Sequence, residues 1–340
     1  MIDIIIGAIA LGLLWGIFTL GVHLTYRILD VADLSVEGTI TTGGVTAATL
    51  IVAGVHPWLA TIAALGMGLV GGLITGLLHT KLKIPMLLSG ILTMTALYSI
   101  NLRINGSANT PLPNQGNKKV ETVFTPVMKL FKKMVGEYED TDSMAWLFDI
   151  ITSKNFAAVI VGILVVVVVS IIVYWFFGTE LGSAIRATGN NQKMVRAQGI
   201  DTSIMIILCV MLSNGLVALA GALIAQYQAF ADIQMGIGSI VIGLASLIIG
   251  EVLVGTKSFK RTLVSLAVGA IIYRIIIALV MKLGMAANDL KLFTAITVAL
   301  CLSLPLFKDA INKLKKKRGD DGNPLDAQPV MNAASSAKED

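Results

Sequence analysis

Asp33-Leu34-Ser35-Val36-Glu37-Gly38-Thr39 is the stretch that decides the fold of this chain, because it places carboxylate and hydroxyl groups between two apolar runs. A charged side chain close to hydrocarbon is costly unless it faces protein or a water-filled cavity. The stretch therefore predicts a pathway through a membrane protein, at the mouth of a membrane-spanning segment, and not a lipid-facing surface.

The rest of the chain has the composition of a polytopic membrane protein. Of its 340 residues, 55% are hydrophobic and 14% are charged, and the mean hydropathy is +0.82. A helix needs about 20 mostly apolar residues to cross a bilayer core of roughly 30 Å, and several runs reach that length. The predicted fold class is therefore all-α. The net charge of +5 lies in short basic clusters between the runs and predicts no nucleic-acid partner.

Nine membrane spans are predicted from the apolar runs and the polar residues between them. They lie near residues 4–23, 39–55, 58–78, 85–101, 156–177, 204–227, 236–254, 262–281 and 289–307. The first run has no basic segment before it and no small-residue cleavage site, so it is interpreted as a retained anchor.

Basic residues follow alternate spans, which predicts that one side of the bundle is cytoplasmic. They are Arg27, Lys81, Lys83, Arg186, Lys193, Arg196, Lys257, Lys260, Arg261 and the cluster from Lys313 to Arg318. Under this count the N-terminus is outside and the C-terminus inside, and the protein is a multi-pass protein of the plasma membrane.

Three parts of the chain are predicted beyond the spans themselves. Residues 1–310 form the transmembrane domain, with an external loop at 102–155, and residues 311–340 form a basic and then disordered cytoplasmic tail. Within the external loop, Thr125-Pro126 is typical of a helix start and predicts a short amphipathic helix. The acidic residues after it either meet an external partner or belong to a solvated loop; they are Glu137, Glu139, Asp140 and Asp142.

The connection at 179–200 is longer than a hairpin needs and predicts two short helices on the cytoplasmic face. Thr179 caps a helix that ends at Gly189, and Asn190 or Asn191 caps a second helix that ends at Gly199. Asp201 or Thr202 then caps the next span. We expect a docking element with a small apolar surface and positive charge, although a connector in the headgroup layer would use the same residues. The surface comprises Ala184, Ile185, Ala187 and Thr188 with Arg186, Lys193 and Arg196.

Two motifs carry a resemblance to a known family. Residues 180–191 with 197–201 resemble the coupling segment of permease subunits in ATP-binding-cassette (ABC) importers of the branched-chain amino acid and ribose group. Asp33-Leu-Ser-Val-Glu-Gly38 resembles the motif that opens a discontinuous span in that group. The likeness covers roughly residues 30 to 307, and within the group the chain looks most like the tryptophan and tyrosine permeases. Ile249-Gly-Glu-Val252 departs from the Gly-Gly pattern of the sugar permeases.

The resemblance implies a transport subunit and not an enzyme. It implies separate ATPase subunits, a second permease copy, most simply as a homodimer, an external solute-binding lipoprotein, and surrounding membrane lipid. This chain has no G-x-x-x-x-G-K-[ST] phosphate loop, so no cofactor is expected in it, and ATP and magnesium are expected on the partner ATPase. The residues that the resemblance assigns to ATPase coupling are Glu180, Gly182, Ala184, Ile185, Arg186, Ala187, Gly189, Asn190, Arg196 and Gly199.

A helix that begins within the membrane directs unpaired N–H groups at a cavity, and this predicts a solute path. The candidate path residues are Ser35, Glu37, Gly38, Thr39, Thr41, Thr42, Asn101, Ser213 and Asn214. Glu37 either pairs with the ammonium of an amino acid or forms a cap with Ser35. Asn101, Ser213 and Asn214 either line the path or bond helices together, and Glu251 is assigned to the cytoplasmic gate or the ATPase contact.

The remaining reactive side chains predict no further chemistry. His23, His56 and His79 lie at span ends with a spacing that makes no metal site, and Cys209 and Cys301 fall inside spans as small apolar residues. The predicted function is an ABC importer permease for a small solute, most simply an aromatic or branched-chain amino acid. An ABC permease for a sugar or nucleoside is an alternative. An ion-gradient-driven secondary transporter is another, although no inverted repeat is found.

Overall fold

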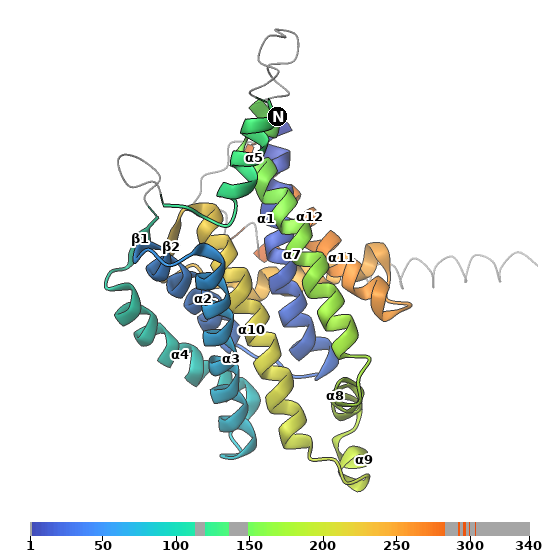
Figure 1. Ribbon diagram of the computed structural model, residues 1–340. Coiled ribbons are helices and arrows are strands. Elements are labelled where there is room, and N and C mark those ends of the chain that lie inside the picture. The colour runs from blue at the N-terminus through green and yellow to red at the C-terminus, as the bar shows by residue number, and fades with distance from the viewer. Residues whose placement is uncertain are drawn as a thin grey trace, which may run out of the picture.

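The computed structural model describes residues 2–112, 120–135 and 149–282, with five further residues between 292 and 303. This part of the chain is a bundle of helices with one small antiparallel pair of strands, which confirms the all-α class (Figure 1). The long helices are α1 (Ile2–His23), α2 (Ser35–Val52), α3 (Pro57–Thr80), α4 (Met86–Asn105), α7 (Lys154–Phe176), α10 (Thr202–Gln228), α11 (Ser239–Val254) and α12 (Phe259–Lys282). The short elements are η1 (Leu24–Ile28), α5 (Thr125–Val135), α8 (Glu180–Asn190), α9 (Gln192–Ala197), β1 (Asn109–Pro111) and β2 (Phe230–Asp232).

The predicted count of nine spans is not supported. In the described residues, six helices are long and apolar enough to cross a membrane: α1 with η1, α3, α4, α7, α10 and α12. Helix α2 begins at Ser35, four residues before its predicted start, and carries too many hydroxyl groups to qualify by composition. Helix α11 is apolar but has only 16 residues.

Several predictions fall outside the described residues or are not decided by the fold. Most of the span predicted at 289–307, Cys301, the acidic residues at 137–142 and the tail at 311–340 lie outside the described part. The predicted orientation of the termini is not supported either, because a helix bundle alone does not identify the two sides of a membrane. The orientation stays a prediction.

Glycines allow the closest helix contacts of the bundle. Gly68 and Gly72 of α3 face α10, and a Cβ on Gly72 would lie 2.5 Å from the carbonyl oxygen of Val210. On the other side of the molecule, Gly12 of α1 faces α12, where a Cβ would lie 2.6 Å from the Cα of Ile271. Small residues at four-residue spacing let membrane helices approach closely. They fix α3 on α10 and α1 on α12.

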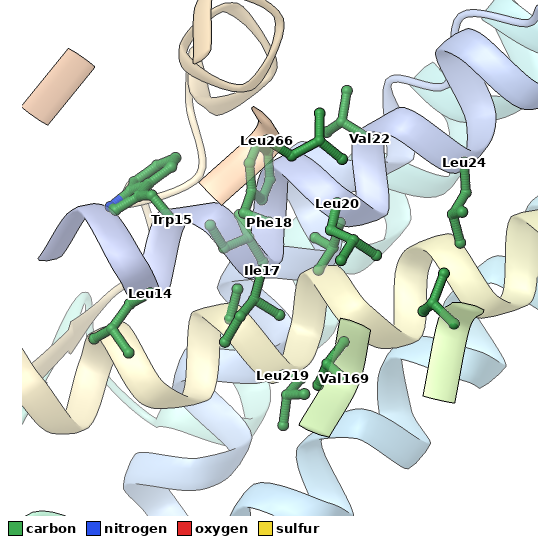
Figure 2. Close-up of a cluster of buried hydrophobic side chains, with 14 of the residues drawn as sticks. Leu14, Trp15, Ile17, Phe18, Leu20, Val22, Leu24, Val169, Leu219 and Leu266 are labelled. Atoms are coloured by element: carbon green, nitrogen blue, oxygen red, sulfur yellow. The ribbon is translucent and has the colours of Figure 1, made fainter. Parts of the chain in front are cut away.

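Helices α1 and α10 form the centre of the bundle. In the most apolar stretches of both, 67% of the residues are buried, against 28% in α4, so α4 lies at the periphery of the bundle. Figure 2 shows part of the buried cluster around α1, in which Ile17 and Phe18 are grouped with Leu219 of α10, Val169 of α7 and Leu266 of α12.

Two helices begin inside the bundle and not at its ends. The start of α2 lies beside Asn214, which is about twelve residues, or roughly 18 Å, along α10 from its first residue. Helix α11 begins where its first backbone amides meet Glu37 of α2. Helix α2, which follows the Asp33 motif, therefore has a counterpart in α11, a second short helix that starts at the same depth.

The α5 end and the α8–α9 end of the bundle are opposite (Figure 1). At the first, β1 pairs antiparallel with β2, with Asn109 opposite Asp232. The helix predicted from Thr125-Pro126 is α5, and it packs on α7 through an edge-to-face contact of Phe131 with Phe156 at 5.5 Å.

Candidate translocation site and coupling end

The start of α2 is held by a buried polar network centred on Asn214. Its amide nitrogen donates to Asp33 Oδ2 at 2.9 Å, and its amide oxygen accepts from the hydroxyls of Ser35 at 3.1 Å and Thr39 at 2.7 Å. All four side chains are at most 2% exposed. Buried polar groups in a membrane must find partners inside the protein, and these do so completely.

Asp33 supplies a cap of α2, a role that the sequence had offered as one alternative for Ser35 and Glu37. Asp33 Oδ1 accepts from the backbone amide of Ser35 at 2.9 Å and from its hydroxyl at 2.6 Å. A carboxylate at the first turn also interacts favourably with the helix dipole. Sequence analysis placed Asp33 in the motif but not among the candidate site residues.

Other predicted path residues also serve to join helices. The hydroxyl of Ser213 donates to the carbonyl of Gly21 at 2.7 Å, and the amide of Asn101 donates to the carbonyl of Gly38 at 3.4 Å. Thr42 is fully buried and donates to the same carbonyl at 3.0 Å. The contacts of Ser213 and Asn101 link α10 to α1 and α4 to α2, which is the interhelical alternative left open by the sequence, whereas the contact of Thr42 stays within α2.

Glu37 differs from its neighbours because it is only partly buried and reaches across to another helix. Its Oε1 accepts from the backbone amide of Gly238 at 3.1 Å, and the amide of Ile240 donates to the same carboxylate. Gly238 has φ +81°, a conformation that favours glycine. Glu37 thus caps α11, so the two inner helix starts meet at one carboxylate.

The loop before α11 lies directly on α2. A Cβ on Gly236 would lie 1.9 Å from the carbonyl oxygen of Glu37 and 2.6 Å from the hydroxyl of Thr41, so only glycine fits there. The hydroxyl of Thr41 itself donates to the carbonyl of Glu37 at 3.2 Å. The candidate translocation site is therefore the junction of Glu37, Thr41 and the turn at 236–238.

At the other end, the predicted helix caps are confirmed. Thr179 accepts from the amide of Gly182 at 3.4 Å, Asn191 from Met194 at 3.1 Å, and Asp201 from Ser203 at 2.8 Å. The amide of Ser203 lowers the pKa of the Asp201 carboxyl below its ordinary value of 3.8, because it stabilises the ionised form. The connection at 179–200 is accordingly two helices, α8 and α9.

The exposed surface of α8 and α9 is not the one expected. Ile185 and Thr188 are completely buried against the bundle, so they are not part of a free apolar surface. The exposed apolar side chains are Leu181 and Met194, at 48% and 45%.

The other predicted coupling residues divide between the two faces. Gly182 is buried, Ala184, Ala187 and Gly189 are half-buried, and those that face outward are Glu180, Arg186, Asn190, Arg196 and Gly199. The coupling role of these residues stays a prediction.

Helix α8 is locked to the turn that follows α1. A Cβ on Gly189 would lie 1.9 Å from the carbonyl oxygen of Ile28, so a larger residue there would displace the helix. Immediately before this turn, Arg27 forms a bidentate ion pair with Glu251 in the last turns of α11, at 2.9 and 2.5 Å. From the sequence, Arg27 was predicted only as a cytoplasmic charge, and Glu251 was assigned to the cytoplasmic gate or the ATPase contact. The ion pair between them was not predicted.

A polar cavity of about 330 Å³ lies beside this ion pair. Among its lining residues are His23, Arg186 and Thr262, together with Arg27 and Glu251. Arg186 donates to the carbonyl of Phe177 at 2.5 Å, and its guanidinium lies 5.7 Å from the centre of the Phe259 ring. Helix α8, the end of α1, the end of α11 and the start of α12 therefore meet around one opening.

Comparison with known proteins agrees with this architecture. The family model described as "Branched-chain amino acid transport system / permease component" matches residues 4–302. The chain belongs to this permease family. No solved structure matches it.

The names of individual relatives of the permease refer to different solutes. It is 36% identical to the tyrosine transport system permease protein of Clostridioides difficile (strain R20291), over 92% of this chain and 95% of that one. It is 28% identical to the inner membrane ABC transporter permease protein YjfF of Escherichia coli (strain K12), over 78% and 71%. It is also 28% identical to the D-allose transport system permease protein of the same organism, over 71% and 64%.

The permease is therefore a membrane-spanning transport subunit of an ABC transport system and a multi-pass protein of the plasma membrane. Membership of the family also implies ATPase subunits and a solute-binding protein in the same system.

Proposed function

We propose that the permease imports an amino acid, most simply an aromatic one such as tyrosine. The observation that carries the proposal is the partly buried carboxylate of Glu37 at the junction of two helices that begin inside the bundle. An ionised side chain at this depth belongs to a path and not to a lipid-facing surface. It offers a counter-charge to an ammonium group, which a sugar lacks. The name of the tyrosine relative supports the same solute class.

The solute reaches this junction from the α5 end and leaves at the α8–α9 end, which we assign to the cytoplasm. The support is that basic residues of separate connections gather there: Lys81 lies near enough to Asp201 to affect its pKa, and Arg27 and Arg186 line one cavity. Cytoplasmic connections carry such an excess. The N-terminus of the described chain is then external.

ATP binds and is hydrolysed, with magnesium, on separate ATPase subunits that contact α8 and α9, and two copies of the permease form a homodimer with a shared path. The exposed Leu181 and Met194, on helices that also carry the exposed Arg186, Lys193 and Arg196, are the apolar contacts for the ATPase. The permease itself binds no cofactor. An external lipoprotein delivers the solute, and no covalent chemistry occurs on it.

Reconstitution of the complete importer tests the proposal. Proteoliposomes that hold the permease, its ATPase and its binding protein should accumulate radiolabelled tyrosine only when ATP is supplied. Leu181→Asp should abolish the accumulation while Ser183→Asp, a matched exposed position on α8, should not. Accumulation of allose in place of tyrosine would assign a sugar as the solute. Accumulation driven by an ion gradient without ATPase would contradict the mechanism altogether.

A further inference from the structure

The junction at Glu37 accounts for one charge inside the bundle, but a second charge remains without a role. Arg274 lies in the middle of α12, fifteen residues after the helix begins at Phe259 and eight before it ends at Lys282. At a rise of about 1.5 Å per residue, it is roughly 12 Å from the nearer helix end. Such a position is within the hydrocarbon depth of a bilayer, where a cation is costly and usually functional.

No carboxylate in the described residues balances this charge. The ion pairs of residues 2–112, 120–135 and 149–282 are Arg27 with Glu251 and Lys129 with Glu121. Arg274 Nε is buried and has no hydrogen-bond partner. A guanidinium does not lose its proton at ordinary pH, so a compensating charge has to come from outside the described residues, and a bound anion is one that can supply it.

The guanidinium lies over an aromatic ring. It lies 4.4 Å from the centre of the Trp15 ring, and Trp15 is itself fixed by an edge-to-face contact with Phe18 at 5.2 Å. The indole nitrogen of Trp15 is buried without a partner and points away from the other side chains of its cluster (Figure 2). A guanidinium stacked on a ring leaves its N–H edge free, which is the geometry that receives a carboxylate with two hydrogen bonds.

The depth of Arg274 matches that of the Glu37 junction. Helices α11 and α12 run antiparallel, since Gly250 packs on Ser265 and Gly269 on Ser246. Continuing this register by five residues brings the backbone of Arg274 level with Val241, in the first turn of α11. Glu37 caps that same turn. A phospholipid phosphate lies at the bilayer surface and is too far from this level to be the anion.

We propose that Arg274, stacked on Trp15, binds the carboxylate of the transported solute. This inference rests on the proposed amino-acid function and makes it more specific. The bundle carries an anion at Glu37 and a cation at Arg274 within about one helical turn of the same depth. An α-amino acid is a zwitterion with both complementary charges, whereas a sugar has neither. Arg274 is then a specificity-determining residue for amino acids.

Fluorescence of Trp15 tests the binding directly. In a permease whose Trp58, Trp146 and Trp175 are replaced by Phe, Trp15 reports on its own stacked guanidinium. The protein in nanodiscs is titrated with tyrosine, tyrosinamide and benzoate, with excitation beyond the tyrosine absorption band. We expect a saturable change with tyrosine and benzoate, which have a carboxylate, and none with tyrosinamide, which lacks it. An equal response to tyrosinamide, or no response to either carboxylate, overturns the proposal.

Transport by the whole importer gives the second measurement. Arg274→Gln should lower tyrosine uptake by roughly tenfold or more, the effect of losing one charged hydrogen bond. The thermal unfolding midpoint should not fall, because an unpaired cation has left the membrane. Arg103→Gln, at an exposed position near the end of α4, is the matched control and should transport like the wild type. A lowered thermal unfolding midpoint with unchanged tyrosine uptake would show that Arg274 has a structural role and would overturn the proposal.

The outcomes separate this inference from the proposed function. If the importer moves no amino acid but benzoate still changes Trp15 fluorescence, the solute class is wrong and the anion site stands. If tyrosine uptake is normal in Arg274→Gln and neither carboxylate affects Trp15, the importer function stands and the anion site is refuted. A response that requires a second permease copy would assign the anion to that copy and refute a solute site.

Discussion

The ion pair of Arg27 with Glu251 should decide how well the α8–α9 end drives the bundle, and its replacement gives a quantitative test. Glu251→Gln removes the charge while it preserves the shape. Helix α8 packs through Gly189 on the turn beside Arg27, and Glu251 lies near the end of α11. When this ion pair is broken, a displacement of α8 is no longer transmitted to α11.

The expected magnitude follows from the burial of the two side chains. The Arg27 side chain is 52% exposed and that of Glu251 is 12% exposed. Fully exposed pairs contribute about 0.2–1 kcal/mol, whereas breaking a buried pair costs about 3–5 kcal/mol. After a discount for solvent screening at Arg27, about 1–2 kcal/mol remains for this pair. That energy corresponds to a roughly 5–30-fold change in the equilibrium between coupled and uncoupled arrangements.

The assay is the number of solute molecules imported per ATP hydrolysed by the reconstituted importer. Glu251→Gln should lower this ratio by roughly 5–30-fold, and the charge swap Arg27→Glu with Glu251→Arg should restore part of it. The matched control is Lys129→Gln, which breaks an exposed pair with Glu121 at the other end of the bundle and should leave the ratio unchanged. A normal ratio in Glu251→Gln, or a swap no better than the single variant, would refute the reasoning.

Four further predictions address stability and transport. Asn214→Leu should destabilise the fold by roughly 3 kcal/mol, because it removes the only hydrogen bond to Oδ2 of the buried Asp33 among the described residues, and thermal unfolding in detergent measures the loss. Glu37→Gln should lower tyrosine uptake without a comparable loss of stability, and equal uptake would restrict Glu37 to capping. Gly72→Leu should prevent α3 from packing on α10 and yield little folded protein by size-exclusion chromatography. The pKa of Asp201 is lower in the folded than in the unfolded protein. Its carboxylate therefore stabilises the fold at pH above the unfolded pKa, and this stabilisation is lost as the pH falls through the folded pKa. Asp201→Asn should weaken the dependence of the unfolding free energy on pH in this acid range.

Local features of this permease were predictable because they depend on neighbours in sequence. The caps at Thr179, Asn191 and Asp201 each use a backbone amide two or three residues ahead, and the structure places all three as expected. The four-residue spacing of glycines in α3 likewise indicates a close helix contact, although it does not identify α10 as the partner. Single-sequence patterns carry this kind of information well.

The candidate site was predicted less completely, because its contacts join distant parts of the chain. Glu37 meets Gly238 across 201 residues, and Arg27 meets Glu251 across 224. Nothing in the spacing of Arg27 distinguishes a topological charge from a partner in an ion pair. The count of nine spans is not supported by the described residues, because α11 has only 16 residues and most of the run at 289–307 lies outside them.

Helix α11 is short and is held by a polar contact at each of its ends. One end is held by the Glu37 carboxylate, and the other end is held by Arg27 through Glu251. A helix of 16 residues spans about 24 Å, less than the hydrocarbon core, so it can tilt without exposing polar ends to lipid. Both of its polar attachments are to the segment that runs from the end of α1 into α2. A displacement of that segment by α8 therefore moves both ends of α11 together, and the solute junction at Glu37 moves with them.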